Sequence, residues 1–139
     1  MDISMLQQKA TDLAHAISKA EGFGVPGALP TRINNPGDME LGDRGWGTEA
    51  AKTVYPKADW NADFSDKTDG CSALRRECFA ILAGASHSFD LSWSFAQLAQ
   101  EWTGNDHEGD WCNTVTEELG ISAEMTLREY ATGESSISA

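Results

Sequence analysis

The chain has 139 residues, enough for one domain with one sizeable hydrophobic core. Its apolar share of 40% and charged share of 23% are close to ordinary globular usage, so wholesale disorder is not expected. A formal net charge of -12 leaves no basic surface for a phosphate backbone, so nucleic acid and anionic membrane surfaces are both disfavoured as partners.

The termini and the cysteines bear on where the protein is made. The N-terminal segment has no basic start followed by an apolar run, so we expect no signal peptide, synthesis in the cytoplasm and no membrane insertion. The chain has three cysteines, Cys71, Cys78 and Cys112, and an odd count argues against a disulfide framework. We expect reduced and mostly buried thiols.

The apolar pattern predicts an amphipathic helix over residues 5–21. Its stripe consists of Leu6, Ala10, Leu13 and Ile17. Glu21 is the next position on this stripe, four residues after Ile17. Gly22 follows directly and suits a C-terminal helix cap.

The chain after this helix has an irregular pattern. Residues 22–48 hold many Gly and Pro residues, which rules out a long helix or a regular central strand. In residues 49–69 the only strand-like hints are Val54-Tyr55 and Phe64. We therefore expect a small irregular or β-hairpin lobe here.

Helical patterns return in the second half of the chain. One follows Gly70 and ends near Gly84. Ser94 and Gln97 fit a capping box, and the helix that they begin continues through Trp102.

Two more helices are predicted towards the C-terminus. Asp110 is the expected cap of a helix that Gly120 closes. The segment from Thr126 to Glu129 fits a second capping box, which begins a short last helix. We expect a mainly α-helical single domain over residues 1–131 and a disordered tail over residues 132–139.

Several motifs resemble cofactor or metal sites but lack features that those sites require. Residues 22–27 match a G-x-G-x-x-G string, but a helix precedes them where a dinucleotide site needs a strand. Residues 59–70 resemble a calcium loop at their first three odd positions but lack its Gly and bidentate Glu, so an acidic surface turn is favoured. The three histidines have no partners at metal-ligand spacing. We expect neither a metal nor a cofactor.

Glu21 is the strongest candidate for chemistry. A glutamate on a buried stripe is costly unless it is paired or protonated, because burial disfavours its charged form. The negative end of the helix dipole acts in the same direction. Both effects raise the pKa of the carboxyl, as a general acid near neutral pH requires. The alternative is that the helix ends one residue earlier and Glu21 points into solvent.

The segment around Glu21 resembles a known family. Residues 20–39 are similar to the start of a bacterial and bacteriophage branch of the lysozyme-like superfamily, whose members look like goose-type lysozymes and lytic transglycosylases. The matching motifs are Glu21-Gly22, Val25-Pro26-Gly27, Leu29-Pro30, Arg32 and Asn34-Asn35-Pro36-Gly37-Asp38. The likeness continues in residues 69–77, where Cys71 stands in place of the family's Trp, and in the helices over residues 94–104 and 111–120.

This resemblance implies a lysozyme-like fold, mainly α with a small β element, and a substrate cleft beside the small lobe. The implied partner is peptidoglycan, cut at the β-1,4 bond between N-acetylmuramic acid and N-acetylglucosamine. Glu21 falls on the family's catalytic glutamate, which gives its proton to the leaving sugar oxygen. Lysozymes keep such a carboxyl protonated by placing it in an apolar pocket.

The sequence does not identify a second catalytic group. Glycoside hydrolysis usually uses two carboxyls, whereas in goose-type and transglycosylase relatives water or the sugar's own C6 hydroxyl attacks. Asp38, Glu40 and Asp43 could orient water, and Glu49 is a weaker candidate. For each of them singly, a solvated loop charge is the favoured interpretation.

Candidates for substrate binding lie in the same region. Asn34 and Asn35 either brace the turn at the following Pro-Gly pair or grip an N-acetyl group. The aromatic side chains that could stack on sugar faces are Trp46, Tyr55 and Trp60. Trp102 and Trp111 lie on helix stripes and are expected in the core.

Two non-enzymatic classes remain open. A non-catalytic lysozyme-like protein could serve as a structural or wall-binding part of a phage particle or secretion device, with phage structural proteins as partners. Cys71 in place of Trp and the open second carboxylate fit that class. A weaker alternative is an acidic protein that binds a basic partner through its surface charge. Under the lysozyme-like hypotheses the protein acts at the cell wall or within a virion.

Overall fold

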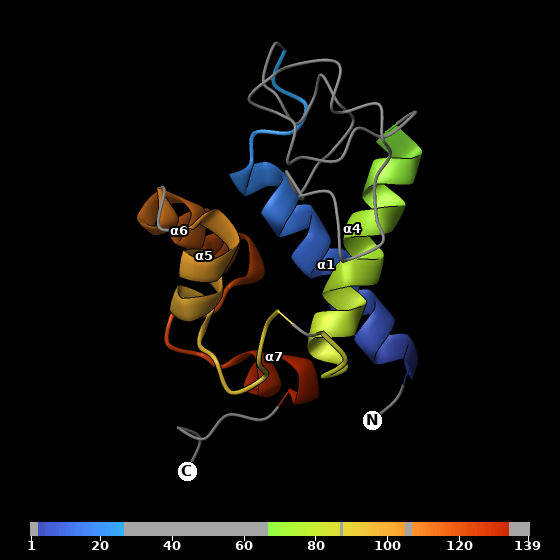
Figure 1. The fold of residues 1–139 in the computed structure, drawn as a ribbon, viewed down its shortest axis with the longest axis vertical. Helices are drawn as coiled ribbons and strands as arrows, with labels where there is room; N and C mark the ends of the chain where they lie inside the picture. Colours follow the sequence, from blue (N-terminus) through green and yellow to red (C-terminus); the bar gives the residue numbers. More distant parts are fainter. Residues whose placement is uncertain (1–2, 27–66, 87, 105–106, 134–139) are drawn as a thin grey trace.

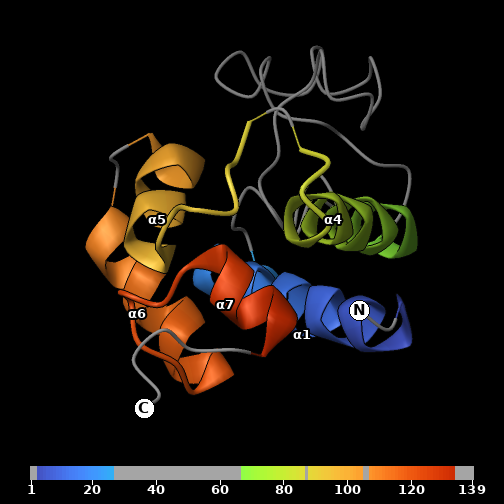
Figure 2. The same ribbon diagram turned by 90° about the horizontal axis from the view of Figure 1, so that it is seen from below.

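The computed structural model describes residues 3–26, 67–86, 88–104 and 107–133, and these ranges are mainly α-helical, as predicted. The helices are α1 (Ile3–Ala20), α4 (Lys67–Leu82), α5 (Phe95–Thr103), α6 (Glu108–Leu119) and α7 (Leu127–Thr132). α1 lies between α4 and α6, α5 packs on α6, and α7 packs on α4 (Figures 1 and 2). The predicted β-hairpin and residues 134–139 of the predicted tail lie outside the described residues. The tail begins later than predicted, because Thr132 is the last residue of α7 and Gly133 caps it.

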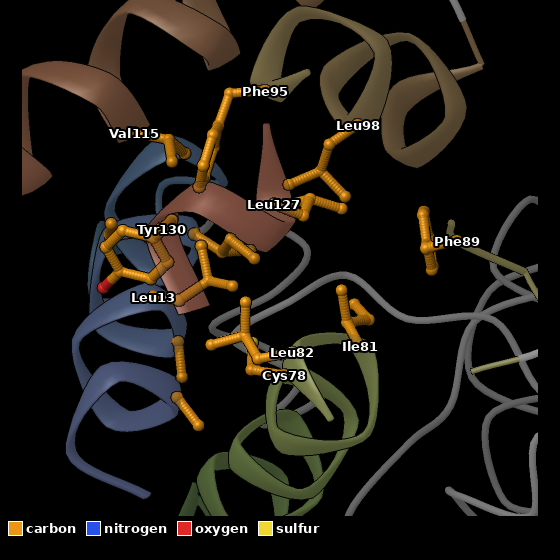
Figure 3. Packing of buried hydrophobic residues seen from close by; sticks show 14 of the residues in the cluster. Leu13, Cys78, Ile81, Leu82, Phe89, Phe95, Leu98, Val115, Leu127 and Tyr130 are labelled. Atoms are coloured by element: carbon orange, nitrogen blue, oxygen red, sulfur yellow. The ribbon is translucent and has the colours of Figure 1, made fainter. Parts of the chain in front are cut away.

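One hydrophobic core joins all the helices. Each described helix contributes side chains with 0–1% of their surface exposed: Leu13 and Ile17 from α1, Leu74 and Ile81 from α4, Phe95 and Leu98 from α5, Val115 from α6, and Leu127 from α7. Figure 3 shows how several of them pack together. Burying one such side chain contributes about 1.5–3 kcal/mol. The predicted stripe of the first helix is therefore a core stripe, and it aligns α1 with its neighbours.

The two predicted capping boxes are confirmed. In α5 the Gln97 backbone N–H donates to Ser94 Oγ at 3.2 Å, and the Ser94 N–H donates to the Gln97 side chain at 2.9 Å. In α7 the Glu129 N–H donates to Thr126 Oγ1 at 3.0 Å, with the reciprocal bond at 2.9 Å. Each box satisfies two N–H groups that a helix start leaves without partners.

The starts of α5 and α7 are also tied to each other. Ser94 and Thr126 form an isolated antiparallel bridge. Beside it, the Leu127 N–H donates to the Trp93 carbonyl at 2.8 Å, and the Phe95 N–H donates to the Met125 carbonyl at 3.0 Å. This junction fixes the backbone that leads into α5.

Two predicted helix starts are wrong. Asp110 is not the cap of α6, because the helix begins at Glu108 after His107, which adopts a left-handed φ of 59° and makes no side-chain capping bond. Asp110 lies in the first turn instead, where its negative charge suits the positive end of the helix. α4 begins at Lys67 rather than after Gly70, and Gly70 is buried inside its first turns.

Candidate active site

The end of α1 sets the backbone position of Glu21. The Glu21 N–H donates to the Ile17 carbonyl at 2.9 Å and so continues the helical ladder. Gly22 follows with φ 78°, and the N–H groups of Gly22 and Phe23 donate to carbonyls of the last turn at 3.2 and 3.0 Å. This is a Schellman motif, in which glycine supplies the left-handed conformation. The predicted cap at Gly22 is confirmed.

The Glu21 side chain points towards α6. It is half-buried, and the Trp111 indole Nε1–H donates to Glu21 Oε2 at 2.9 Å. Trp111 lies near the start of α6 and is only 4% exposed. The helix does end at Ala20, one residue before Glu21, but the carboxyl is held against α6 rather than pointing into solvent.

A charged pair joins α1 and α6 two residues before Glu21. Lys19 Nζ lies 2.9 Å from Glu118 Oε2, and His15 Nε2 lies 3.5 Å from Glu118 Oε1. The hydrogen bond and the positive charge of Lys19 lower the pKa of the Glu118 carboxyl. The two helices are thus linked by the hydrophobic core, by this exposed pair and by the hydrogen bond between Trp111 and Glu21.

Aromatic rings extend from the partner of Glu21 across α5. Trp111 stacks on Trp102 with ring centroids 5.9 Å apart, and Trp102 stacks on Phe89 at 5.5 Å. Phe89 meets Trp93 edge to face at 6.2 Å. We call Trp111, Trp102, Phe89 and Trp93 the aromatic row. It connects the Glu21 carboxyl to the turn before α5.

The two tryptophans predicted for the core have different environments. Trp111 is buried, as expected, whereas Trp102 is half-buried between its two stacking partners. Sequence reasoning missed that Trp111 holds Glu21, because the two residues are 90 positions apart and no local pattern links them.

Most of the other predicted site residues lie outside the described ranges. They are Arg32, Asn34, Asn35, Asp38, Glu40, Asp43, Trp46, Glu49, Tyr55 and Trp60. Their roles in binding substrate or orienting water therefore stay predictions.

The cysteines are described and carry free thiols. Cys78 and Cys112 are buried, and Cys71 is half-buried. Burial raises the pKa of the Cys78 thiol well above its ordinary value. The prediction of mostly buried thiols is confirmed for Cys78 and Cys112.

Comparisons with known proteins leave the family open. No protein-family model, curated protein or solved structure matches the chain. Within the described ranges, no three His, Cys, Asp or Glu side chains gather as a metal site needs, and none of the helices there is long and apolar enough to cross a membrane. Function is therefore inferred from the residues of this chain.

Proposed function

We propose that the protein cleaves the glycan strands of peptidoglycan, with Glu21 as general acid at the β-1,4 bond between N-acetylmuramic acid and N-acetylglucosamine. The observation that carries this proposal is the hydrogen bond from the buried Trp111 indole to the half-buried Glu21 carboxyl at the end of α1. The resemblance of residues 20–39 to the start of a lysozyme-like branch supports the same residue as the acid.

The chemistry requires a proton on the leaving oxygen. As the bond from C1 to the glycosidic oxygen breaks, that oxygen takes the proton of the Glu21 carboxyl and leaves as a hydroxyl. C1 is then attacked by water, which gives a reducing end, or by the C6 hydroxyl of the same sugar, which gives a 1,6-anhydro product. The attacking oxygen loses its proton, which returns the Glu21 carboxylate to its acid form directly or through solvent. General acids contribute about 10²–10⁴-fold to such rates.

Trp111 serves this chemistry as a positioning residue. Its N–H binds one of the two carboxyl oxygens, Oε2, and thereby sets the direction in which the carboxyl plane faces. A catalytic acid needs such fixed geometry, because proton transfer falls steeply when the donor is misplaced. The indole is itself fixed by burial and by its stack on Trp102.

The remaining parts of the site belong to the proposal as predictions. We expect the substrate cleft beside Glu21, with the small lobe predicted from the irregular sequence after α1 as its other wall. Asp38 and Glu40 are the candidates for orienting water, and the tryptophans and tyrosine predicted for this lobe are the candidates for stacking on sugars.

Mass spectrometry of purified peptidoglycan digested with the protein tests this function. The proposal predicts released muropeptides, and heat-unfolded protein is the control. A reducing end identifies a lysozyme, and a 1,6-anhydro end identifies a lytic transglycosylase. Protein that sediments with the walls but releases no muropeptide would overturn the proposal in favour of a non-catalytic wall-binding role.

A further inference from the structure

A polar hollow lies on the exposed side of α5, away from the core. It measures about 280 Å³ and is lined by Trp93, Gln97, Gln100 and Glu101. Drug-sized ligands occupy pockets of roughly 300–1,000 Å³, so this hollow suits a smaller group such as one sugar ring. Its lining combines two amides, a carboxylate and a single aromatic side chain.

Trp93 is held in place by the junction of α5 and α7. Its N–H donates to the Asp90 carbonyl at 3.0 Å, and its carbonyl accepts the Leu127 N–H at 2.8 Å. Its ring is half-buried and meets Phe89 edge to face. A rigid, partly exposed indole binds a ligand with little loss of side-chain entropy.

The side chains of the hollow match the chemistry of an uncharged sugar. A pyranose ring presents an apolar C–H face, which packs on an indole, and polar groups around its edge. Gln100 carries an amide that donates to and accepts from hydroxyl and acetamido groups, and the Glu101 carboxylate accepts from hydroxyls. The oxygen of the Gln97 amide accepts from Ser94 in the capping box, so Gln97 offers a ligand its amide N–H groups. Glu101 and the net charge of -12 disfavour an anionic ligand.

The hollow is connected to the proposed catalytic carboxyl. Glu21 binds Trp111, Trp111 stacks on Trp102, Trp102 stacks on Phe89, and Phe89 contacts Trp93. The hollow therefore lies at the far end of the aromatic row, three ring-to-ring contacts beyond Trp111. A glycan strand of several sugars is long enough to span these contacts.

We infer that this hollow on α5 is a subsite for an N-acetylated, uncharged sugar ring of the glycan that Glu21 acts on. The inference rests on the proposed function, because it names where the same substrate is held beyond the cleaved bond. Trp93 would contact the face of the ring, and Gln100 and Glu101 would contact its edge.

Binding of triacetylchitotriose tests the subsite without turnover. The Glu21→Gln variant, labelled with ¹⁵N, is titrated with the trisaccharide, and the Trp93 indole signal is assigned from its loss in Trp93→Phe. We expect this signal to shift on binding. Trp93→Ala should raise Kd about tenfold.

A second variant guards against misfolding, because Trp93 also packs on the core. Gln100→Ala changes an exposed side chain of α5 and should raise Kd about threefold. The matched control is Gln7→Ala, an exposed glutamine of α1, which should leave Kd unchanged.

The outcomes separate the subsite from the proposed function. If wild-type protein releases muropeptides while Trp93→Ala and Gln100→Ala bind the trisaccharide normally, the subsite is wrong and the function stands. If both variants lose binding while wild-type protein releases nothing, the subsite stands and catalysis is wrong. A Trp93 signal that responds to trilysine but not to the sugar would also overturn the subsite, in favour of a basic partner.

Discussion

Replacing Trp111 by Phe tests whether the indole holds the Glu21 carboxyl. The change removes the N–H that donates to Glu21 at 2.9 Å but keeps an aromatic ring against Trp102. A typical hydrogen bond contributes about 0.5–1.5 kcal/mol net, and burial of the indole favours the upper end, about 1.5 kcal/mol. The smaller ring at a site only 4% exposed costs a further ~1–2 kcal/mol in packing.

A double-mutant cycle separates the hydrogen bond from the packing loss. Urea unfolding of Trp111→Phe, Glu21→Ala and the double variant should give a coupling energy of about 1.5 kcal/mol. The control pair of Trp102→Phe with Glu21→Ala should couple by less than about 0.5 kcal/mol. Wall cleavage by Trp111→Phe should be about tenfold slower, since 1.4 kcal/mol corresponds to a factor of ten. A coupling energy near zero for the Trp111 pair would refute the positioning role.

Three further predictions concern the glycine cap of α1, the ion pair between α1 and α6, and a buried cysteine of α4. Gly22→Ala should lower the free energy of unfolding by about 1–2 kcal/mol in urea titrations, because φ 78° strains any L side chain. The variant should also cleave walls more slowly, because the strain moves Glu21. An unchanged urea midpoint would contradict this. Glu118→Gln should lower Tm at neutral pH, and the difference from wild type should vanish in acid. Lys19 lowers the pKa of the Glu118 carboxyl, so the stability that this pair contributes is lost as pH falls through that pKa. A difference in Tm that persists in acid would count against the pair. Cys78 should resist iodoacetamide in native protein and react only after unfolding, as mass spectrometry of the peptides can show.

Features encoded within a few residues could be predicted from the sequence. The stripe of the first helix, its glycine cap and both capping boxes depend on contacts between residues no more than five apart, and the structure confirms them. The same local pattern identifies Glu21 as a candidate, because Glu21 continues that stripe. Whether the Glu21 side chain is buried depends on which element covers the end of α1, and in the structure that element is α6.

Features that depend on tertiary packing could not be predicted. The Trp111 partner of Glu21 is set by the way α6 crosses α1, which no local pattern encodes. The predicted start of α4, after Gly70, is too late: Gly70 is buried within the helix, where packing outweighs the low helix propensity of glycine. His107 precedes α6 without a side-chain cap, so the start of that helix carries no capping signal.

The rate of muropeptide release from purified walls by Glu21→Gln tests the central claim most directly. Gln keeps the size of the side chain and an oxygen that can accept the Trp111 N–H, but it has no proton to give. The matched control is Glu117→Gln, an exposed glutamate of α6. We predict a fall of at least about 100-fold for Glu21→Gln and wild-type rates for the control. Equal rates for wild-type protein and Glu21→Gln would show that Glu21 is not the acid.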